Sequence, residues 1–121
     1  MTNPRLVAYE LLQRVALESA YANLLLPSLL AQHRLSGRDA GFVTELSFGT
    51  LRWRGLLDAA IEIAAGRELE RIDPPLRDVL RLGAYQLLCM RVPAHAAVDT
   101  SVELAAAVGK SSAKGFVNAT L

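Results

Sequence analysis

Two arginines flank the single tryptophan of the chain in the string Arg52-Trp53-Arg54, the most suggestive grouping of chemically active side chains in the sequence. Guanidinium groups make bidentate contacts with phosphate oxygens, and an indole ring can stack on an unpaired base. The string therefore indicates a site for phosphate and a nucleobase. The alternative, which the pattern slightly favours, is that Trp53 packs in the core while both arginines stay in solvent.

Two lysines form a second candidate anion site. Lys110 and Lys114 bracket the expected start of the last helix, which Ser111 or Ser112 is predicted to cap. The free N–H groups of a helix N-terminus also favour an anion. A plain capped turn explains the same residues equally well. Arg5 and Arg14 are weaker candidates, because they fall about half a turn apart on the first predicted helix and form no single basic ridge.

No residue pattern predicts catalysis by this chain. Cys89 lies in an apolar stretch and is expected to be a buried, inert thiol. His33 and His95 lack partners at metal-binding spacing, so no metal site is predicted. Asp99 and Glu103 lie one turn apart, which fits a solvated helix face better than an acid–base pair. The glycines form no nucleotide-binding loop, so no cofactor site is predicted and binding is favoured over catalysis.

Composition predicts a single cytosolic domain over residues 1–121. The chain has 52% hydrophobic residues, a net charge of +1 and one cysteine, which fits a reducing compartment. No apolar run approaches the length of a membrane span, and the N-terminus has no signal-peptide pattern. Arginine outnumbers lysine by 11 to 2. This bias suits phosphate contacts, although a GC-rich genome is the favoured explanation.

The stretch 76–90 is predicted to be the central helix. Asp73-Pro74 is a strong start, with Asp73 as the N-cap acceptor. The polar side chains of its first two turns share one side: Arg77, Asp78 and Arg81. Beyond them the helix is apolar all round except for Gln86, which is typical of a buried helix. Gly83 is expected to permit close approach of a crossing helix.

The other segments also show helical spacing, and none alternates as a strand does. A first helix is expected to start at Pro4 and a second to run from Pro27 to about His33. A third is expected after a Ser36 cap assisted by Asp39, with Gly49 bending or ending it. A fourth is expected to have Leu56 and Leu57 inward and to end at Gly66. Two more follow Pro93 and Ser111 or Ser112. The fold class is therefore all-α, with about seven short helices around a central buried one. Because the last helix still runs at Leu121, a cut chain is expected.

Four strings of the sequence resemble the NusB-like helical domain. They are residues 42–54, 80–88, 91–105 and 115–119, and in order and spacing they cover nearly the whole chain. The strings Leu-Arg-Trp-Arg and Val-Pro-Ala-His-Ala-Ala-Val resemble more narrowly the N-terminal domain of the RsmB family, also called Fmu or Sun. The enzymes of this family are S-adenosylmethionine-dependent and make 5-methylcytosine in small-subunit ribosomal RNA.

The resemblance implies two packed helical subdomains and a role in binding ribosomal RNA. It also implies a catalytic Rossmann-like domain downstream, which would carry the S-adenosylmethionine loop and two catalytic cysteines. The expected partners are thus RNA, the protein's own C-terminal methyltransferase domain and a ribosomal protein. Tyr21, Asn23 and Asn118 match family motifs, and structural roles are expected for them.

One departure from the family pattern changes the expected RNA contacts. Free-standing NusB proteins open with a run of arginines, whereas here only Arg5 remains, followed by Leu6, Val7 and Ala8. Arg52, Arg54, Lys110 and Lys114 are therefore the preferred RNA-binding candidates. Two other functions stay open: a protein-docking scaffold, with Leu6 and Leu17 in its surface, or a free-standing transcription antitermination factor.

Overall fold

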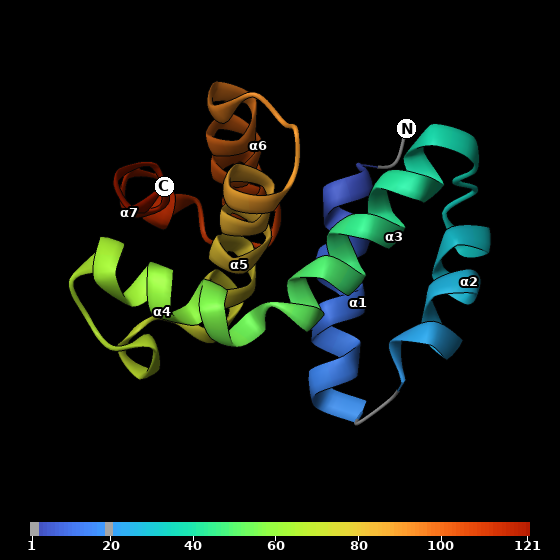
Figure 1. The fold of residues 1–121 in the computed structure, drawn as a ribbon, viewed down its shortest axis with the longest axis horizontal. Coiled ribbons are helices and arrows are strands. Elements are labelled where there is room, and N and C mark those ends of the chain that lie inside the picture. The colour runs from blue at the N-terminus through green and yellow to red at the C-terminus, as the bar shows by residue number, and fades with distance from the viewer. Residues whose placement is uncertain (1–2, 19–20) are drawn as a thin grey trace.

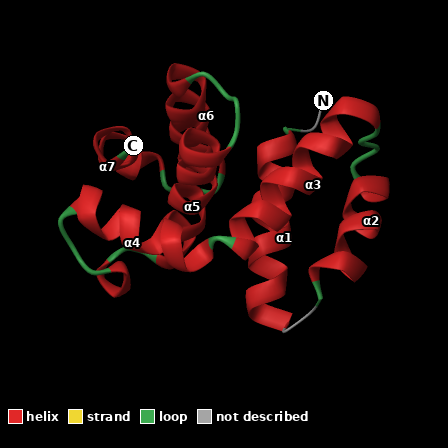
Figure 2. Cartoon of the chain, viewed as in Figure 1, coloured by secondary structure: helices red, strands yellow, loops and turns green. Residues whose placement is uncertain are grey.

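The described part of the chain, residues 3–18 and 21–121 of a computed structural model, consists of helices and connections, without a strand (Figures 1 and 2). This confirms the all-α prediction. The α-helices, seven in these residues, are α1 Pro4–Glu18, α2 Ala22–Gln32, α3 Gly37–Arg52, α4 Arg54–Ala65, α5 Pro74–Cys89, α6 Ala94–Ala107 and α7 Lys114–Thr120. Short 3₁₀ helices, η1 Leu69–Arg71 and η2 Ser111–Ala113, precede α5 and α7.

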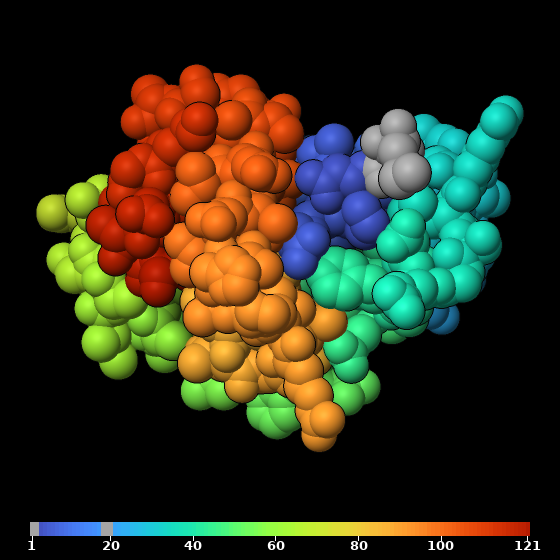
Figure 3. All heavy atoms as spheres, turned by 90° about the horizontal axis from the view of Figure 1, so that it is seen from above, coloured from blue at the N-terminus to red at the C-terminus, as the bar shows by residue number. Residues whose placement is uncertain are grey.

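Helix α5 is the centre of the packing, as predicted. It contacts α1 and α3 on one side and α4, α6 and α7 on the other (Figure 1). Helix α5 therefore joins two groups of helices, α1 to α3 and α4 with α6 and α7. Figure 3, seen from above, shows α7 on the left of the molecule and α2 and the start of α3 on the right. The core includes Leu80, Leu82 and Leu104, each no more than 1% exposed.

The polar side of α5 is largely buried. Asp78 and Arg81 are buried, because they pair with each other and each also has a partner on another helix, Gln13 for Asp78 and Asp58 for Arg81. Cys89 is exposed rather than buried, because it is the last residue of α5 and lies beyond the helices that cover the middle of α5. Asp73 precedes α5 without a side-chain cap, and its carboxylate instead pairs with Lys110 at 2.6 Å.

Two predicted glycine roles are confirmed by the backbone. A Cβ added at Gly83 would lie 2.5 Å from Ser101 Oγ and 2.6 Å from Leu121 Cδ1, so α5 and α6 cross closely there. Gly66 ends α4 in the left-handed conformation, with φ 67°. Gly49 does not end α3, which continues to Arg52. Its missing side chain leaves room for the ring of Tyr85.

Several predicted boundaries were wrong in detail. Helix α2 starts at Ala22 rather than Pro27. Pro27 lies inside the helix, where it removes one backbone hydrogen bond without ending it. Ser36 and Ser111 lie where helical turns begin, but neither α3 nor α7 receives a side-chain cap. Leu56 is 57% exposed instead of inward, because Leu57 and Ile61 already fill the buried face of α4. No described helix is long and apolar enough to cross a membrane.

Candidate nucleic-acid interface

The Arg52-Trp53-Arg54 string forms the joint between α3 and α4. Trp53 ends one helix and begins the next: its N–H donates to the Gly49 carbonyl at 3.0 Å, and its own carbonyl accepts from Leu57 N–H at 2.9 Å. One residue between two helices leaves little room for the side chain to turn inward. Trp53 is accordingly 47% exposed, and both neighbouring arginines are exposed. The packed-core alternative for Trp53 is therefore wrong.

Arg54 lies beside a buried chain of ion pairs and hydrogen bonds. Its Nε is 3.9 Å from Asp58 Oδ2, and the Arg54 side chain remains 55% exposed. Asp58 accepts two shorter bonds from Arg81, from Nε at 2.6 Å and from NH2 at 3.1 Å. This bidentate geometry makes Arg81 the main partner of Asp58. The Arg54 guanidinium is thus held near the protein surface with most of its donors available.

The chain of bonds continues from α5 to α1. Arg81 NH1 donates to Asp78 Oδ1 at 2.9 Å, and Gln13 Nε2 donates to Asp78 Oδ2 at 2.6 Å. Burial is the largest single effect on Arg81 and would lower its pKa. The hydrogen bonds and charges of Asp58 and Asp78 together outweigh it, so the pKa of Arg81 is raised. Arg81 therefore stays charged. The i,i+3 spacing of Asp78 and Arg81 was a usable signal for part of this network.

The two lysines differ in their surroundings. Lys110 is bound to Asp73 at 2.6 Å, whereas Lys114, the first residue of α7, is exposed. Helix α7 has only seven residues, and the turn of η2 comes between the two lysines. The structure therefore does not form the bracketed helix terminus that the sequence suggested, and Lys114 is the more accessible cation.

Arg5 is committed to the interior of the fold. Its Nε donates to Gln86 Oε1 at 2.8 Å, and its guanidinium lies 4.8 Å from the centre of the Phe42 ring. Burial lowers the pKa of Arg5, and the charge of Glu103 partly opposes this shift. These contacts join α1, α3 and α5. Arg14 is half-buried beside a shallow groove between α1 and the end of α6.

The remaining residues singled out in the sequence lie apart from the joint. Asp99 and Glu103 are exposed, as expected for a solvated face. Asn118 is exposed, and its side chain makes no hydrogen bond to the described residues, contrary to expectation. Tyr21 fixes the start of α2 through its carbonyl, which accepts from two backbone N–H groups. In the described ranges no three His, Cys, Asp or Glu side chains group closely enough to hold a metal ion.

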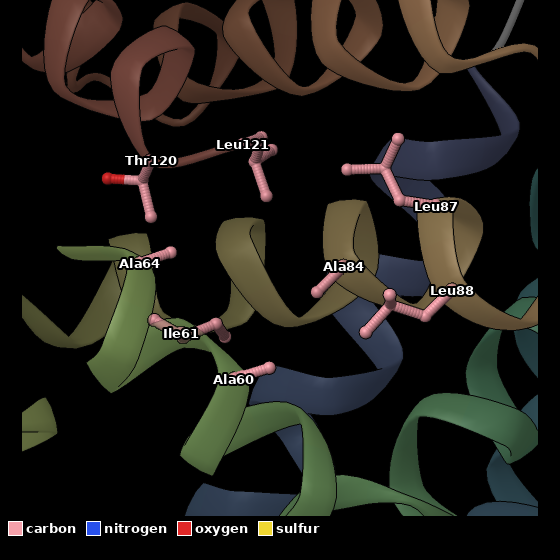
Figure 4. Close-up of a pocket in the computed structure, with 8 residues that line it drawn as sticks. All are labelled: Ala60, Ile61, Ala64, Ala84, Leu87, Leu88, Thr120 and Leu121. Atoms are coloured by element: carbon pink, nitrogen blue, oxygen red, sulfur yellow. The ribbon is translucent and has the colours of Figure 1, made fainter.

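A second surface feature is an apolar groove between α4, α5 and the end of the chain, about 170 Å³ in volume (Figure 4). The sequence-based reading missed this groove. Leu88, expected in a buried helix, is 61% exposed at its edge. The sequence signal that could have indicated it is the pair of small residues Ala60 and Ala64, one turn apart on α4, which face the apolar last turn of α5. The groove is lined by Ala60, Ile61, Ala64, Ala84, Leu87, Leu88, Thr120 and Leu121.

The fold and these surfaces define a small all-helical domain built on a central helix, with an exposed Arg-Trp-Arg joint. The model of the NusB family matches residues 2–121. The chain belongs to the NusB family.

Two curated relatives are methyltransferases by name. A Mycobacterium tuberculosis protein with a provisional methyltransferase name is 57% identical over 117 residues, which are 97% of this chain and 26% of that protein. Ribosomal RNA small subunit methyltransferase B of Pseudomonas putida is 37% identical over 119 residues, 98% of this chain and 27% of that protein. The chain thus spans about a quarter of the length of the curated relatives it matches.

Solved structures support the fold. The antitermination factors NusB and NusE in complex with double-stranded RNA include a chain that matches with a TM-score of 0.85. That match has 22% sequence identity and covers 97% of this chain and 89% of the other. A structure described as a plectonemic RNA supercoil matches with the same TM-score and identity. At this identity the likeness establishes the NusB-like fold, which confirms the predicted architecture.

Proposed function

We propose that this domain binds ribosomal RNA and positions it for an attached S-adenosylmethionine-dependent cytosine-C5 methyltransferase. The observation that supports this most strongly is the similarity of almost the whole chain to one quarter of proteins named as methyltransferases. In this proposal, the cofactor and the catalytic residues belong to the remainder of a longer protein. The domain itself contributes binding and orientation.

The Arg52-Trp53-Arg54 joint is the proposed RNA contact. Two exposed guanidinium groups can neutralise neighbouring phosphates, and the half-exposed Trp53 ring offers a face for stacking an unpaired base. Lys114 is a further candidate because it is exposed. Lys110, Arg5 and Arg14 are proposed as minor contributors, since all three side chains are partly buried and Lys110 and Arg5 pair with Asp73 and Gln86.

A salt titration with charge-reversal variants tests this proposal. The purified domain is titrated with a short ribosomal RNA hairpin across a salt series. Each neutralised phosphate contributes about 0.7 to 0.9 to the log–log slope of affinity against salt. The double variant Arg52→Glu/Arg54→Glu is expected to weaken binding at least tenfold and to reduce the slope. Arg38→Glu/Arg91→Glu, a double reversal at two other exposed arginines, is the matched control and is expected to bind nearly as wild type.

Two results would contradict the proposal. One is absence of RNA binding by the wild-type domain even at low salt. The other is a normal methylation rate in a full-length enzyme from which the domain has been deleted.

A protein-docking module is the second candidate function, and the apolar groove of Figure 4 favours it. In this view the groove receives the methyltransferase part of the longer protein or a ribosomal protein. Leu17, 81% exposed, is a separate apolar side chain on the surface of α1, whereas Leu6 already packs against the core. Leu88→Asp should weaken docking and leave RNA affinity unchanged, and Arg52→Glu/Arg54→Glu should do the reverse.

A further inference from the structure

A partly enclosed pocket lies next to Arg54, where α1, α3, α4 and α5 meet. Its volume is about 150 Å³. One part of its lining is apolar and comes from α1 and α3, and the other part carries polar groups. The lining residues are Leu12, Val15, Ala16, Thr50, Leu51, Arg54, Asp78 and Arg81. The pocket is therefore amphipathic, and Arg54 is its exposed cation.

Thr50 carries a buried hydroxyl group that has no partner. Thr50 is 1% exposed, and no donor or acceptor of the described residues pairs with its Oγ1. Other helical threonines behave differently: the hydroxyls of Thr44, Thr100 and Thr120 each donate to the carbonyl one turn earlier. A buried polar group without a partner lowers stability and calls for an explanation. Ser47 of the same helix also has a buried hydroxyl without a partner, but it does not line the pocket. Thr50 does, so a ligand group that enters the pocket and reaches its covered hydroxyl supplies an explanation there.

The other polar groups of the pocket are mostly occupied. Arg81 uses its Nε, NH1 and NH2 for Asp58 and Asp78. Each oxygen of Asp78 already accepts one hydrogen bond, and a carboxylate oxygen can accept a second. The free capacity thus consists of the Thr50 hydroxyl, the spare lone pairs of Asp78 and the Arg54 guanidinium. These groups suit a ring with both donors and acceptors at its edge, attached to an anion.

Size limits the ring to one. A cavity of about 150 Å³ in another protein binds benzene, so this volume suits a single six-membered ring better than the fused rings of a purine. The apolar side chains from α1 and α3 would contact the faces of such a ring. The pocket also opens beside the Arg-Trp-Arg joint, which carries the cations and the stacking surface for the neighbouring nucleotides.

We infer that this pocket binds one unstacked pyrimidine base of a single-stranded RNA segment, with the Thr50 hydroxyl paired to the base edge and Arg54 on the adjoining phosphate. This inference rests on the proposed RNA-binding function and adds a preference for the unpaired nucleotide. Proteins that read single-stranded RNA commonly splay bases out in this manner and bond their edges.

The test compares RNA hairpins that share one stem and differ in a single unpaired nucleotide, uridine or cytidine against adenosine. Wild-type protein is expected to bind a pyrimidine hairpin more tightly. Thr50→Val keeps the side-chain shape and is expected to lower this preference on the order of threefold to tenfold, the equivalent of one hydrogen bond. Its urea midpoint should not fall, because no protein partner of the hydroxyl is lost.

A second variant blocks the pocket from its mouth. Ala16→Phe, at an exposed lining residue, is expected to abolish the pyrimidine preference while binding through Arg52 and Arg54 persists. Ala59→Phe, on an exposed part of α4 outside the pocket, is the matched control. If Thr50→Val and Ala16→Phe retain the wild-type preference, or if wild type shows none, the inference is overturned while RNA binding stands. Absence of all RNA binding would remove both.

Discussion

Replacement of Arg81 by methionine should be the most destabilising single change in the buried ion network. Arg81 links Asp58 of α4 to Asp78 of its own helix, and the three side chains are 8%, 23% and 10% exposed. Without the guanidinium, two carboxylates remain close together with no cation between them. Breaking a buried pair in this way costs about 3–5 kcal/mol, and the partial exposure of Asp58 places the expected loss near the lower end, about 3 kcal/mol.

The decisive comparison is with a triple variant that removes all three charges. Arg81→Met/Asp58→Asn/Asp78→Asn leaves no stranded charge, and replacing a whole buried ion cluster is often close to neutral. We expect it to recover more than half of the loss seen for Arg81→Met. Free energies of unfolding would be measured by urea denaturation at 25 °C and pH 7. Arg91→Met, at an exposed arginine after α5, is the control and should change stability by less than about 0.5 kcal/mol.

Two outcomes would refute this reasoning. A loss below about 1 kcal/mol for Arg81→Met would mean that water or a rearrangement compensates the carboxylates. A triple variant as unstable as Arg81→Met would mean that packing of the arginine stem, and not stranded charge, accounts for the loss.

Three further predictions concern packing, titration and surface. Gly83→Ala should destabilise the fold by about 1–2 kcal/mol in urea melts, since the new Cβ meets Ser101. Gly41→Ala, where the new Cβ meets no other atom, should stabilise the fold by up to about 1 kcal/mol, and equal effects of the two variants would contradict the close crossing of α5 and α6. Burial, with smaller effects from nearby charges, raises the pKa of Tyr85. The contribution of the neutral Tyr85 side chain to stability is therefore present below about pH 10 and is lost as pH rises through the folded-state pKa. Tyr85→Phe should flatten the alkaline stability profile, and an unchanged slope would count against this. Leu88→Asp should leave the urea midpoint within error; a large decrease would show that this exposed leucine supports the core.

The predictable part of the fold rests on local signals. Asp73-Pro74, Gly66 and the apolar spacing of α5 act within one or two turns, so the helices and the central role of α5 could be predicted from the sequence. The fate of Asp78 and Arg81 could not, because their burial depends on Asp58, which lies 23 residues from Arg81 and on another helix. Polar spacing alone indicates a solvated side unless such a partner is known.

The candidate site shows the same division. Exposure of Trp53 was one of two predicted possibilities, and the abrupt joint between α3 and α4 decides in its favour, whereas both possibilities placed Arg52 and Arg54 in solvent. The pairing of Lys110 with Asp73 could not be predicted, since the segment before α5 and the segment before η2 meet only in the folded chain. The pocket beside Thr50 is likewise invisible to sequence patterns, because four helices contribute to it.

The ion network also bears on where the proposed RNA contact is held. A continuous chain of hydrogen bonds runs from Gln13 through Asp78 and Arg81 to Asp58, and so from α1 through α5 to α4. Apolar packing tolerates small shifts between helices, whereas these bonds are directional. Arg54 lies one turn before Asp58, so the network fixes the position of this cation relative to the rest of the joint. The triple variant should therefore fold stably yet bind the RNA hairpin several-fold more weakly, and wild-type affinity in that variant would show that packing alone positions Arg54.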